Sequence, residues 1–326
     1  MVRPFSQRVA EPGWRDEVTG WITEQVGAHG HRVIGPIEQP RIRPWSTQLV
    51  VPTDDGRWWF KANCRTMAFE PAMHVALSEL APEAVDRPCA IDASRGWMLT
   101  ADHGQTLDEI GEPTARDWQA IVAENARLQG IVAPHRDLLL GTGMPDCGPA
   151  TTLDRFDRLL SVYTDLPDQH PAYVPPELEV RLLSVRPRLV DAVAQLNASL
   201  LPTTWQHGDL HPGNAHHRGG TSTEDHGMRL FDFGDSQWAH ALESLVVPFG
   251  WITSLSQIPW EPVLAAYAAA WGVDVETVID DWWAASTTHA INRSVTWWGC
   301  LAEATADEWR QWGNSPVTHL SRVLDA

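Results

Sequence analysis

The chain is almost devoid of lysine. Lys61 is the only one, and the other 23 of the 24 basic residues are arginine. Positive charge as a whole is scarce, because 42 acidic residues leave a formal net charge of −18. Nucleic acids and anionic membranes both require basic patches that neutralise phosphate. The composition therefore argues against either as a partner, and it suits a cationic ligand or simply a solvated acidic surface.

Cysteine and long apolar runs are also scarce. The four cysteines lie far apart and form no C-x-x-C pair, so neither a disulfide framework nor a thiolate metal site is indicated. There is no apolar segment at the start and no uncharged apolar stretch of membrane-spanning length, so a soluble cytoplasmic protein is expected. With 326 residues and 43% hydrophobic content, the chain can bury a large core, and its length suits two lobes around a cleft.

The strongest motif is HGDLHPGN at residues 207–214, followed by FDFGDS at residues 231–236. Asp209 is a carboxylate that can accept a proton from a hydroxyl. Asn214 follows it by five residues, and Asp232 opens an Asp-Phe-Gly triplet, as in the kinase pattern H-x-D-x-x-x-x-N with a later D-F-G. Asn214 and Asp232 supply oxygen ligands for magnesium. The pattern predicts phosphoryl transfer from ATP.

A hairpin explains how the two metal ligands meet. Residues 214–218 read as a strand, 219–227 as a polar turn, and 228–233 as a second strand that delivers Asp232 beside Asn214. Histidines are frequent in this part of the chain, but they show neither H-E-x-x-H nor a cysteine partner at zinc-ligand spacing, so structural zinc is not favoured. These histidines are His207, His211, His216, His217 and His226.

The first hundred residues predict a leading helix and a small antiparallel sheet. Apolar residues recur at helical spacing from Trp14 to Val26, before the glycines of 27–30. Asp54, Asp55 and Gly56 have the composition of a hairpin turn. The expected strands are 31–38, 45–51, 57–62 and 96–100.

Lys61 ends the third of these strands, where a compact ammonium can contact phosphate oxygens as a point charge. A chance survivor in an arginine-rich chain is the alternative. Glu70, which begins a helix just before Pro71, is the candidate partner that holds Lys61 toward the phosphates, and Glu79 is its competitor.

Two loops complete the expected nucleotide site. Residues 43–47 fall where a kinase covers the phosphates, although G-x-G-x-x-G is missing. Backbone amides and the Ser46 or Thr47 hydroxyls could contact phosphate there, with an ordinary strand entry as the alternative. Ala101, Asp102 and His103 belong to the expected connection between lobes, whose backbone groups would recognise adenine.

Helical patterns dominate the rest of the chain. The expected helices are 115–129, 153–163, 177–200, 242–255, 262–271, 275–290 and 295–312. Residues 141–150 and 165–176 are loop-rich, and the second of these loops could border an acceptor site.

HGDLHPGN followed by DFG, with Lys61 upstream, resembles the aminoglycoside phosphotransferase and choline kinase-like family, from about Arg32 onward. The resemblance implies an α+β, two-lobed protein kinase-like fold. Residues 1–102 would form an N-lobe with a small antiparallel sheet, and residues 103–326 a mainly helical C-lobe. It also implies ATP and Mg²⁺ as cofactors, transfer of the γ-phosphoryl group to a hydroxyl of a small molecule, and Asp209 as the catalytic base.

Supporting roles follow for two neighbours of the motif. His207 is expected to brace the catalytic loop through hydrogen bonds rather than to react. Asp235 is expected to stabilise the magnesium loop, with contact to the acceptor as the alternative.

Two other functions stay open. A protein kinase is disfavoured because Gly208 replaces the arginine that follows the catalytic-loop histidine, and because the only Ala-Pro-Glu triplet, residues 81–83, lies far upstream. A catalytically inactive nucleotide-binding scaffold is disfavoured because Lys61, Asp209, Asn214 and Asp232 are all retained.

The acceptor is predicted from composition alone. Ten of the 18 tryptophans occur from Trp238 onward, and aromatic faces pack on sugar rings or hold cations, although helix packing explains most of them. The carboxylates expected to recognise amino groups are Asp280, Asp281, Glu303, Asp307 and Glu308. An aminoglycoside or amino sugar is the first choice. Neutral sugars, amino alcohols, nucleosides and macrolides remain open, as do oligomeric state and the preference for ATP over GTP.

Overall fold

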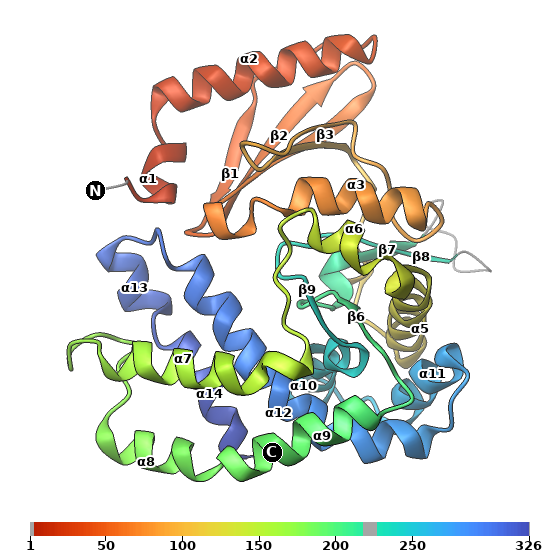
Figure 1. Ribbon diagram of the computed structural model, residues 1–326. Helices are drawn as coiled ribbons and strands as arrows, with labels where there is room; N and C mark the ends of the chain where they lie inside the picture. Colours follow the sequence, from red (N-terminus) through yellow and green to blue (C-terminus); the bar gives the residue numbers. More distant parts are fainter. Residues whose placement is uncertain (1–2, 218–226, 326) are drawn as a thin grey trace.

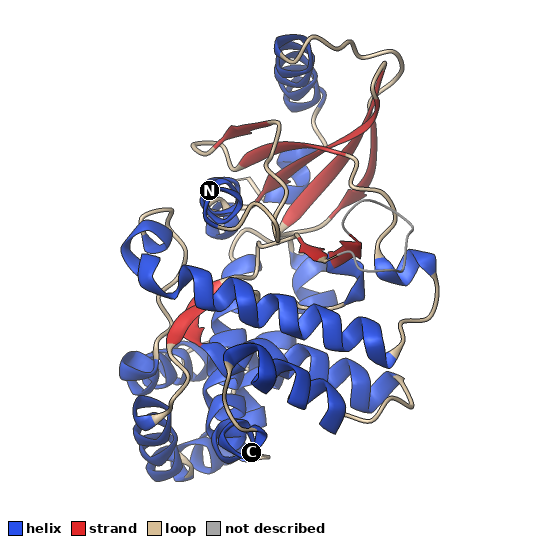
Figure 2. Cartoon of the chain, turned by 90° about the vertical axis from the view of Figure 1, so that its right-hand side faces the viewer, coloured by secondary structure: helices blue, strands red, loops and turns tan. Residues whose placement is uncertain are grey.

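The computed structural model describes residues 3–217 and 227–325. A twisted sheet and its covering helix form one end of the molecule, and helices make up most of the other end (Figures 1 and 2). The sheet is antiparallel, with strand order β1-β2-β3-β5-β4. Its strands are β1 (Glu38–Ile42), β2 (Ser46–Thr53), β3 (Gly56–Asn63), β4 (Ala90–Asp92) and β5 (Trp97–Ala101). The expected α+β class is confirmed.

Two helices pack on the sheet. α2 (Pro12–Ala28) covers the outer face, where Val18 and Ile22 are buried against Leu49 and Phe60 (Figure 1). α3 (Glu70–Leu80) lies between the sheet and the helical part, and Pro71 is accommodated in its first turn as expected. The short α1 (Phe5–Val9) instead joins a cluster with the far end of the chain.

The helical part surrounds the hairpin of residues 214–233 that carries Asn214 and Asp232, which we call the catalytic hairpin. The largest core cluster includes Phe233 of the Asp-Phe-Gly triplet, so the metal loop is anchored in packed apolar side chains. Two short two-stranded sheets flank the segments 207–214 and 231–236. One is formed by β6 (Thr203–Gln206) and β9 (Gln237–His240), and the other by β7 (Ala215–His217) and β8 (Met228–Leu230). The helices are α4 (Leu107–Ile110), α5 (Ala115–Val132), α6 (Arg136–Leu140), α7 (Thr152–Thr164), α8 (Pro176–Ser184), α9 (Arg186–Ala198), α10 (Val246–Leu255), α11 (Glu261–Trp271), α12 (Val275–Cys300), α13 (Ala306–Trp312) and α14 (Ser315–Ser321).

The first strand was placed too early by the sequence pattern. Residues 31–37 form only an isolated bridge, between Val33 and Thr53, and β1 starts at Glu38. Pro40 lies inside β1, which is possible because β1 is an edge strand and needs no hydrogen bond from that position. The register shifts between Glu38 and Arg41, so β1 contains a bulge. β4, β6 and β9 were not predicted.

Three helix predictions were wrong in detail. The helix expected at 177–200 is divided at Val185, because Pro187 in the first turn of α9 cannot continue a preceding helix. The expected break at 291–294 is absent, since α12 runs unbroken to Cys300. The chain breaks later instead, where Thr305 and Glu308 form a capping box that starts α13. The segment expected at 242–255 begins as a 3₁₀ helix, Ala241–Leu245, before α10.

The catalytic hairpin is present with shorter strands than expected. Asn214 ends a 3₁₀ turn, Pro212–Asn214, and β8 ends at Leu230, so Asp232 lies in a loop after the strand. Most of the predicted turn at 219–227, and His226 with it, falls outside the described residues. Among the described residues, no single helix is both long and apolar enough to cross a bilayer, and only α11 and α12 taken together, bent by 105°, pass on length and composition.

Buried histidines should make the fold sensitive to acid. Burial lowers the pKa of His74, His207 and His240 to about 4, that of His319 to about 3, and that of His289 well below its usual value. Below the ordinary histidine pKa, the unfolded chain therefore binds more protons than the folded chain, and stability falls as pH falls.

We expect the unfolding free energy to decrease between pH 7 and pH 5, by up to about 2 kcal/mol per buried histidine. Urea denaturation at the two pH values measures this loss. In a His240→Gln variant, the loss should be smaller than in the wild type. A loss in His240→Gln as large as in the wild type would contradict the burial of a neutral imidazole at this position.

Candidate active site

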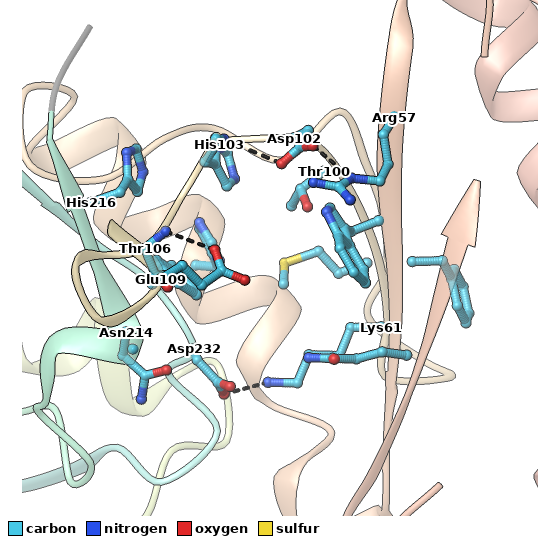
Figure 3. A pocket seen from close by; sticks show the side chains of 18 of the residues that line it. Arg57, Lys61, Thr100, Asp102, His103, Thr106, Glu109, Asn214, His216 and Asp232 are labelled. Atoms are coloured by element: carbon cyan, nitrogen blue, oxygen red, sulfur yellow. Dashed lines mark hydrogen bonds and ion pairs between the residues drawn. The ribbon is translucent and has the colours of Figure 1, made fainter. Parts of the chain in front are cut away.

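A cavity of about 470 Å³ lies between the inner face of the sheet and the catalytic hairpin. Asp102 and His103 line one end, and Lys61 with Asp232 lines the other (Figure 3). Trp59 and Thr100 lie between these ends on neighbouring strands, because Trp59 pairs with Thr100 and precedes Lys61 by two residues. The cavity therefore has an apolar middle and two polar ends.

The ion pair predicted for Lys61 is present. Its Nζ lies 2.8 Å from Oε1 and 2.6 Å from Oε2 of Glu70, and 2.6 Å from Oδ1 of Asp232. Burial would lower the pKa of Lys61, but the two carboxylates outweigh that effect and raise it, so the ammonium is charged. Glu70 is fully buried and also accepts from Asn63 Nδ2 and from the backbone N–H of Phe233. Glu70 thus joins β3 to the Asp-Phe-Gly loop.

The competing carboxylate, Glu79, lies elsewhere. Its side chain is 54% exposed and it pairs with Arg87, so Glu70 is the partner of Lys61.

The structure does not bring the side chains of Ser46 and Thr47 to the cavity. Both are buried, and the Thr47 hydroxyl donates to the carbonyl of Arg41 while accepting from Gln39. A hydroxyl engaged in this way cannot also contact phosphate. Neither Ser46 nor Thr47 is among the residues that line the cavity, whereas Arg41 and Gln48 of the neighbouring positions are.

The predicted connection at 101–104 follows β5 directly. Ala101 is the last residue of β5 and is not among the lining residues, whereas Asp102, His103 and Gly104 line the cavity. The backbone N–H of Asp102 donates to the backbone carbonyl of Arg57, and the Asp102 carboxylate accepts from Nε of Arg57 at 2.7 Å. These bonds fix the start of the connection against β3.

The two predicted metal ligands face each other. Asn214 donates from Nδ2 to the carbonyl of Asp209 at 2.9 Å, and its side-chain oxygen points toward the Asp232 carboxylate (Figure 3). The backbone N–H of Phe231 donates to the carbonyl of Asn214, which holds the two strands together. Asp232 has φ of 63°, a left-handed conformation that aspartate tolerates better than most residues. An amide oxygen and a carboxylate in this arrangement fit Mg²⁺, a hard cation that prefers oxygen ligands.

Asp209 lies beside this pair, at the start of the hairpin. His211 Nδ1 accepts from the N–H of Gly213, so Nε2 carries the proton and points toward Oδ2 of Asp209 at 3.6 Å. On the other side, Arg293 lies 3.5 Å from Oδ1. Burial would raise the pKa of Asp209, but His211 and Arg293 outweigh it and lower the pKa to about 2. Asp209 is therefore ionised at neutral pH.

Arg293 is a site residue that the sequence did not reveal. It extends from α12 and donates to the carbonyl of Gly208 at 3.0 Å and to Oδ1 of Asp235 at 2.8 Å. Gly208 has φ of 81°, and a Cβ there would overlap the carbonyl of Asp235. An arginine at position 208, as in protein kinases, is excluded by this close approach. Arg293 brings a guanidinium to the same loop from a distant helix.

The two supporting residues hold the loop in place. His207 is fully buried, accepts from the N–H of Asp209 through Nδ1, and donates from Nε2 to the carbonyl of Phe231. It therefore joins the catalytic loop to the metal loop. Burial raises the pKa of Asp235 to about 6, with Arg293 opposing the rise.

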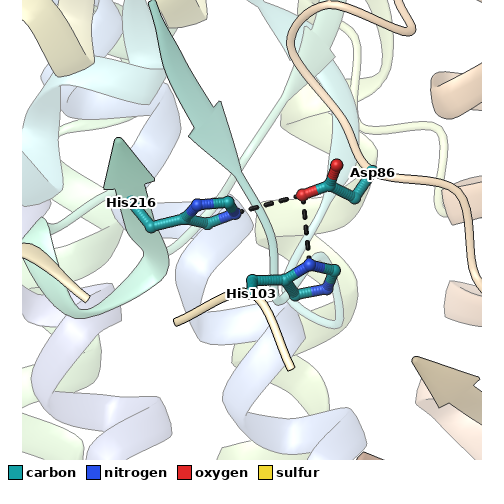
Figure 4. A group of neighbouring side chains, drawn as sticks. All are labelled: Asp86, His103 and His216. Carbon is teal, nitrogen blue, oxygen red and sulfur yellow. Dashed lines mark ion pairs between the residues drawn. The ribbon is translucent and has the colours of Figure 1, made fainter. Parts of the chain in front are cut away.

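A cluster of side chains around Asp86 joins the segment after β5 to the catalytic hairpin. His103 Nδ1 and His216 Nε2 lie 3.1 Å and 3.2 Å from Oδ2 of Asp86 (Figure 4). Arg229 lies 2.8 Å from Oδ1. The two imidazole rings are nearly parallel, 11° apart with centroids 5.2 Å apart, and the Arg229 cation already pairs with the other oxygen of Asp86. We interpret the cluster as an ionic contact between segments rather than a metal site.

The carboxylates expected to recognise amino groups make contacts elsewhere. Asp281 is buried and accepts from Gln195 and Ser199, and Glu303 pairs with Arg8. Asp307 pairs with Arg310, Glu308 caps α13, and Asp280 is exposed. None of these five carboxylates is among the residues that line the cavity, so this part of the acceptor prediction stays a prediction.

Other groups lie next to the catalytic loop. Trp251 of α10 is 42% exposed and stacks on His211, with ring centroids 5.1 Å apart. Asp108 lines the cavity close to Gly213, and its charge helps to raise the pKa of His211. An aromatic face and a carboxylate therefore flank the loop that carries Asp209.

Comparison with known proteins identifies this architecture. A sequence model described as the phosphotransferase enzyme family matches residues 70–282. The chain belongs to this family. The matched segment holds Glu70, Asp209, Asn214 and Asp232, and the family consists of small-molecule kinases. This phosphotransferase is therefore an enzyme that moves a phosphoryl group from a nucleoside triphosphate to an alcohol group of a small molecule.

Solved structures show the same fold at low sequence identity. A Plasmodium vivax ethanolamine kinase matches with a TM-score of 0.60 and 12% identity over 89% of this chain and 82% of its own. An aminoglycoside 2'-phosphotransferase-IIIa, in a GDP complex, matches with a TM-score of 0.58 and 17% identity over 94% and 98%. Choline kinase LicA from Streptococcus pneumoniae matches with a TM-score of 0.54 and 14% identity over 94% and 99%. A search of curated proteins finds no match. The kinase-like fold of the phosphotransferase is thereby established.

Proposed function

We propose that this phosphotransferase transfers the γ-phosphoryl group of ATP, as its Mg²⁺ complex, to a hydroxyl of a sugar, with an amino sugar or aminoglycoside as the first choice. The observation that carries the proposal is the convergence of Lys61, Asp232 and Asn214 at one end of the cavity, with Asp209 bonded to Asn214. The N-lobe of residues 1–102 and the C-lobe of residues 103–326 would enclose the nucleotide between them.

The cavity lining is polar at both ends and apolar between them, and this arrangement would orient the nucleotide. The base would lie against the connection at Asp102 and His103, between Trp59 of the sheet and Phe231 of the hairpin. Indole and phenyl faces favour stacking with a planar base. The phosphates would then extend to Lys61, whose ammonium is held by Glu70. Among the related structures, one carries GDP and another, of LicA, carries AMP. One end of the cavity therefore suits the base of such a nucleotide, and the other end suits its phosphates.

Magnesium, held by Asn214 and Asp232, would neutralise charge on the phosphates as the γ-phosphoryl group separates. Asp209 would orient the acceptor hydroxyl and take its proton. A carboxylate whose pKa is about 2 is a weak base, so its main contribution is to position the hydroxyl, with the proton moving late in the transfer. His211 and Arg293 fix the two oxygens of Asp209 for that task.

The groups beside Asp209 support a sugar acceptor. The exposed face of Trp251 can pack on the apolar face of a sugar ring, next to the carboxylate that receives the hydroxyl proton. Asp108 offers a negative charge for an amino substituent. The related ethanolamine, choline and aminoglycoside kinases act on acceptors that carry amino or ammonium groups, which agrees with this choice.

The test is magnesium-dependent release of ADP from ATP across a panel of aminoglycosides, amino sugars, neutral sugars and amino alcohols. We expect aminoglycosides or amino sugars to stimulate release above the acceptor-free rate. If only amino alcohols stimulate release, the acceptor is an amino alcohol rather than a sugar, and the assignment as a small-molecule kinase still holds. Tight binding of Mg-ATP with no stimulation by any acceptor would favour a nucleotide-binding scaffold.

A further inference from the structure

The phosphate end of the cavity contains a second cation, Arg41, in line with Lys61. In the sheet, Arg41 pairs with Gln48, Gln48 pairs with Lys61, and Lys61 pairs with Met98. Side chains directly opposite each other on adjacent strands point to the same face. All four residues line the cavity, which agrees with this register. Arg41 and Lys61 are thus two strands apart in one row that faces the nucleotide site.

The bulge in β1 creates this placement. Glu38 pairs with Val50, and Arg41 pairs with Gln48, so three steps along β1 correspond to two along β2. Without the extra residue, Pro40 would lie opposite Gln48 and Arg41 would point to the other face. Bulges next to active sites commonly redirect a side chain in this way. The Thr47 hydroxyl, which donates to the Arg41 carbonyl at 2.8 Å, fixes the backbone at this point.

Arg41 has no anionic partner within the described part of the chain. Its Nε is buried without a hydrogen bond, and no described carboxylate lies within ion-pair distance of its guanidinium. By contrast, Arg57 at the other end of the cavity is paired with Asp102. Burying a charged donor without a partner is unfavourable, so the arrangement suits a ligand that supplies negative charge. The charge of Arg41 already helps to lower the pKa of Asp232.

We propose that Arg41 binds the phosphate chain of the nucleotide together with Lys61. This inference rests on the proposed function. Residues 43–47 lack the glycines that let a loop backbone wrap phosphates, and the Thr47 hydroxyl already donates to the Arg41 carbonyl. The planar guanidinium, which donates in a fork, supplies hydrogen bonds to phosphate oxygens from the strand before that loop.

The test compares binding of Mg-ATP and adenosine by calorimetry in wild type and Arg41→Met. We expect the variant to bind Mg-ATP on the order of 10- to 100-fold more weakly, the range for a lost hydrogen bond to a charged group. Adenosine, which has no phosphate, should bind equally to both proteins, and this result also shows that the variant is folded. Arg41→Lys should recover part of the affinity.

Arg43→Met is the matched control, because Arg43 is exposed two residues further along and the change in net charge is the same. It should bind Mg-ATP like the wild type. Equal weakening in both variants would reduce the role of Arg41 to general electrostatics and overturn the inference. So would wild-type affinity in Arg41→Met. If the wild type binds no Mg-ATP at all, the proposed function fails and the inference fails with it.

Discussion

Replacing Asp209 by asparagine should reduce kcat by about 10²- to 10⁴-fold, the usual contribution of a positioned general base. Asparagine has the size of aspartate but cannot accept the hydroxyl proton. Asp209 contacts His211 and Arg293 and does not line the nucleotide cavity, so binding of Mg-ATP should be nearly unchanged. Turnover with a stimulating acceptor and calorimetric titration with Mg-ATP give the two numbers.

The matched control for this variant is Asp16→Asn, the same chemical change at an exposed position on α2, which covers the outer face of the sheet. It should turn over at the wild-type rate. Undiminished turnover in Asp209→Asn would defeat the assignment of the base. A loss of turnover accompanied by an equal loss of Mg-ATP affinity would mean that Asp209 acts in binding rather than in transfer.

The second large effect is expected for Asp232→Asn. Asparagine tolerates the left-handed φ of 63° at this position, so the backbone of the loop should persist. Lys61 keeps its pair with Glu70. The lost charge weakens the metal site, and we expect Kd for ATP in the presence of magnesium to rise by at least about tenfold, the lower range for losing a charged interaction. Magnesium should then no longer increase ATP affinity.

Titrations with ATP in the presence and absence of magnesium measure this dependence. Asp16→Asn is again the control, because it makes the same chemical change at an exposed position on α2 and is not among the residues that line the cavity. It should keep the magnesium dependence. If Asp232→Asn binds ATP with the same magnesium dependence as the wild type, Asp232 is not a metal ligand.

The catalytic hairpin could be predicted because its parts are close in sequence. Asn214 follows Asp209 by five residues, and one turn between short strands returns the chain to Asp232. Contacts between residues this close in sequence do not depend on how the surrounding helices are arranged. Lys61 and Glu70 were also accessible, since both occupy defined positions in a strand and a helix that the pattern predicts.

Arg293 and Arg41 could not be found in this way. Arg293 meets Asp209 across 84 residues, and the contact depends on how α12 packs beneath the catalytic loop. One arginine among 23 gives no signal on its own. Arg41 faces the cavity because of a bulge in a strand that contains proline, and neither the bulge nor the strand start was evident from alternation. Pro187, in contrast, was a visible signal for dividing the helix expected at 177–200.

The most direct measurement is detection of the transferred group on the acceptor itself. The wild type is incubated with Mg-ATP and the best acceptor of the panel, and the products are followed by mass spectrometry and by phosphorus NMR. We expect one phosphoryl group on an acceptor hydroxyl, formed in equal amount with ADP and absent with Asp209→Asn. ADP with free phosphate and an unmodified acceptor, or phosphate found only on protein, would contradict it.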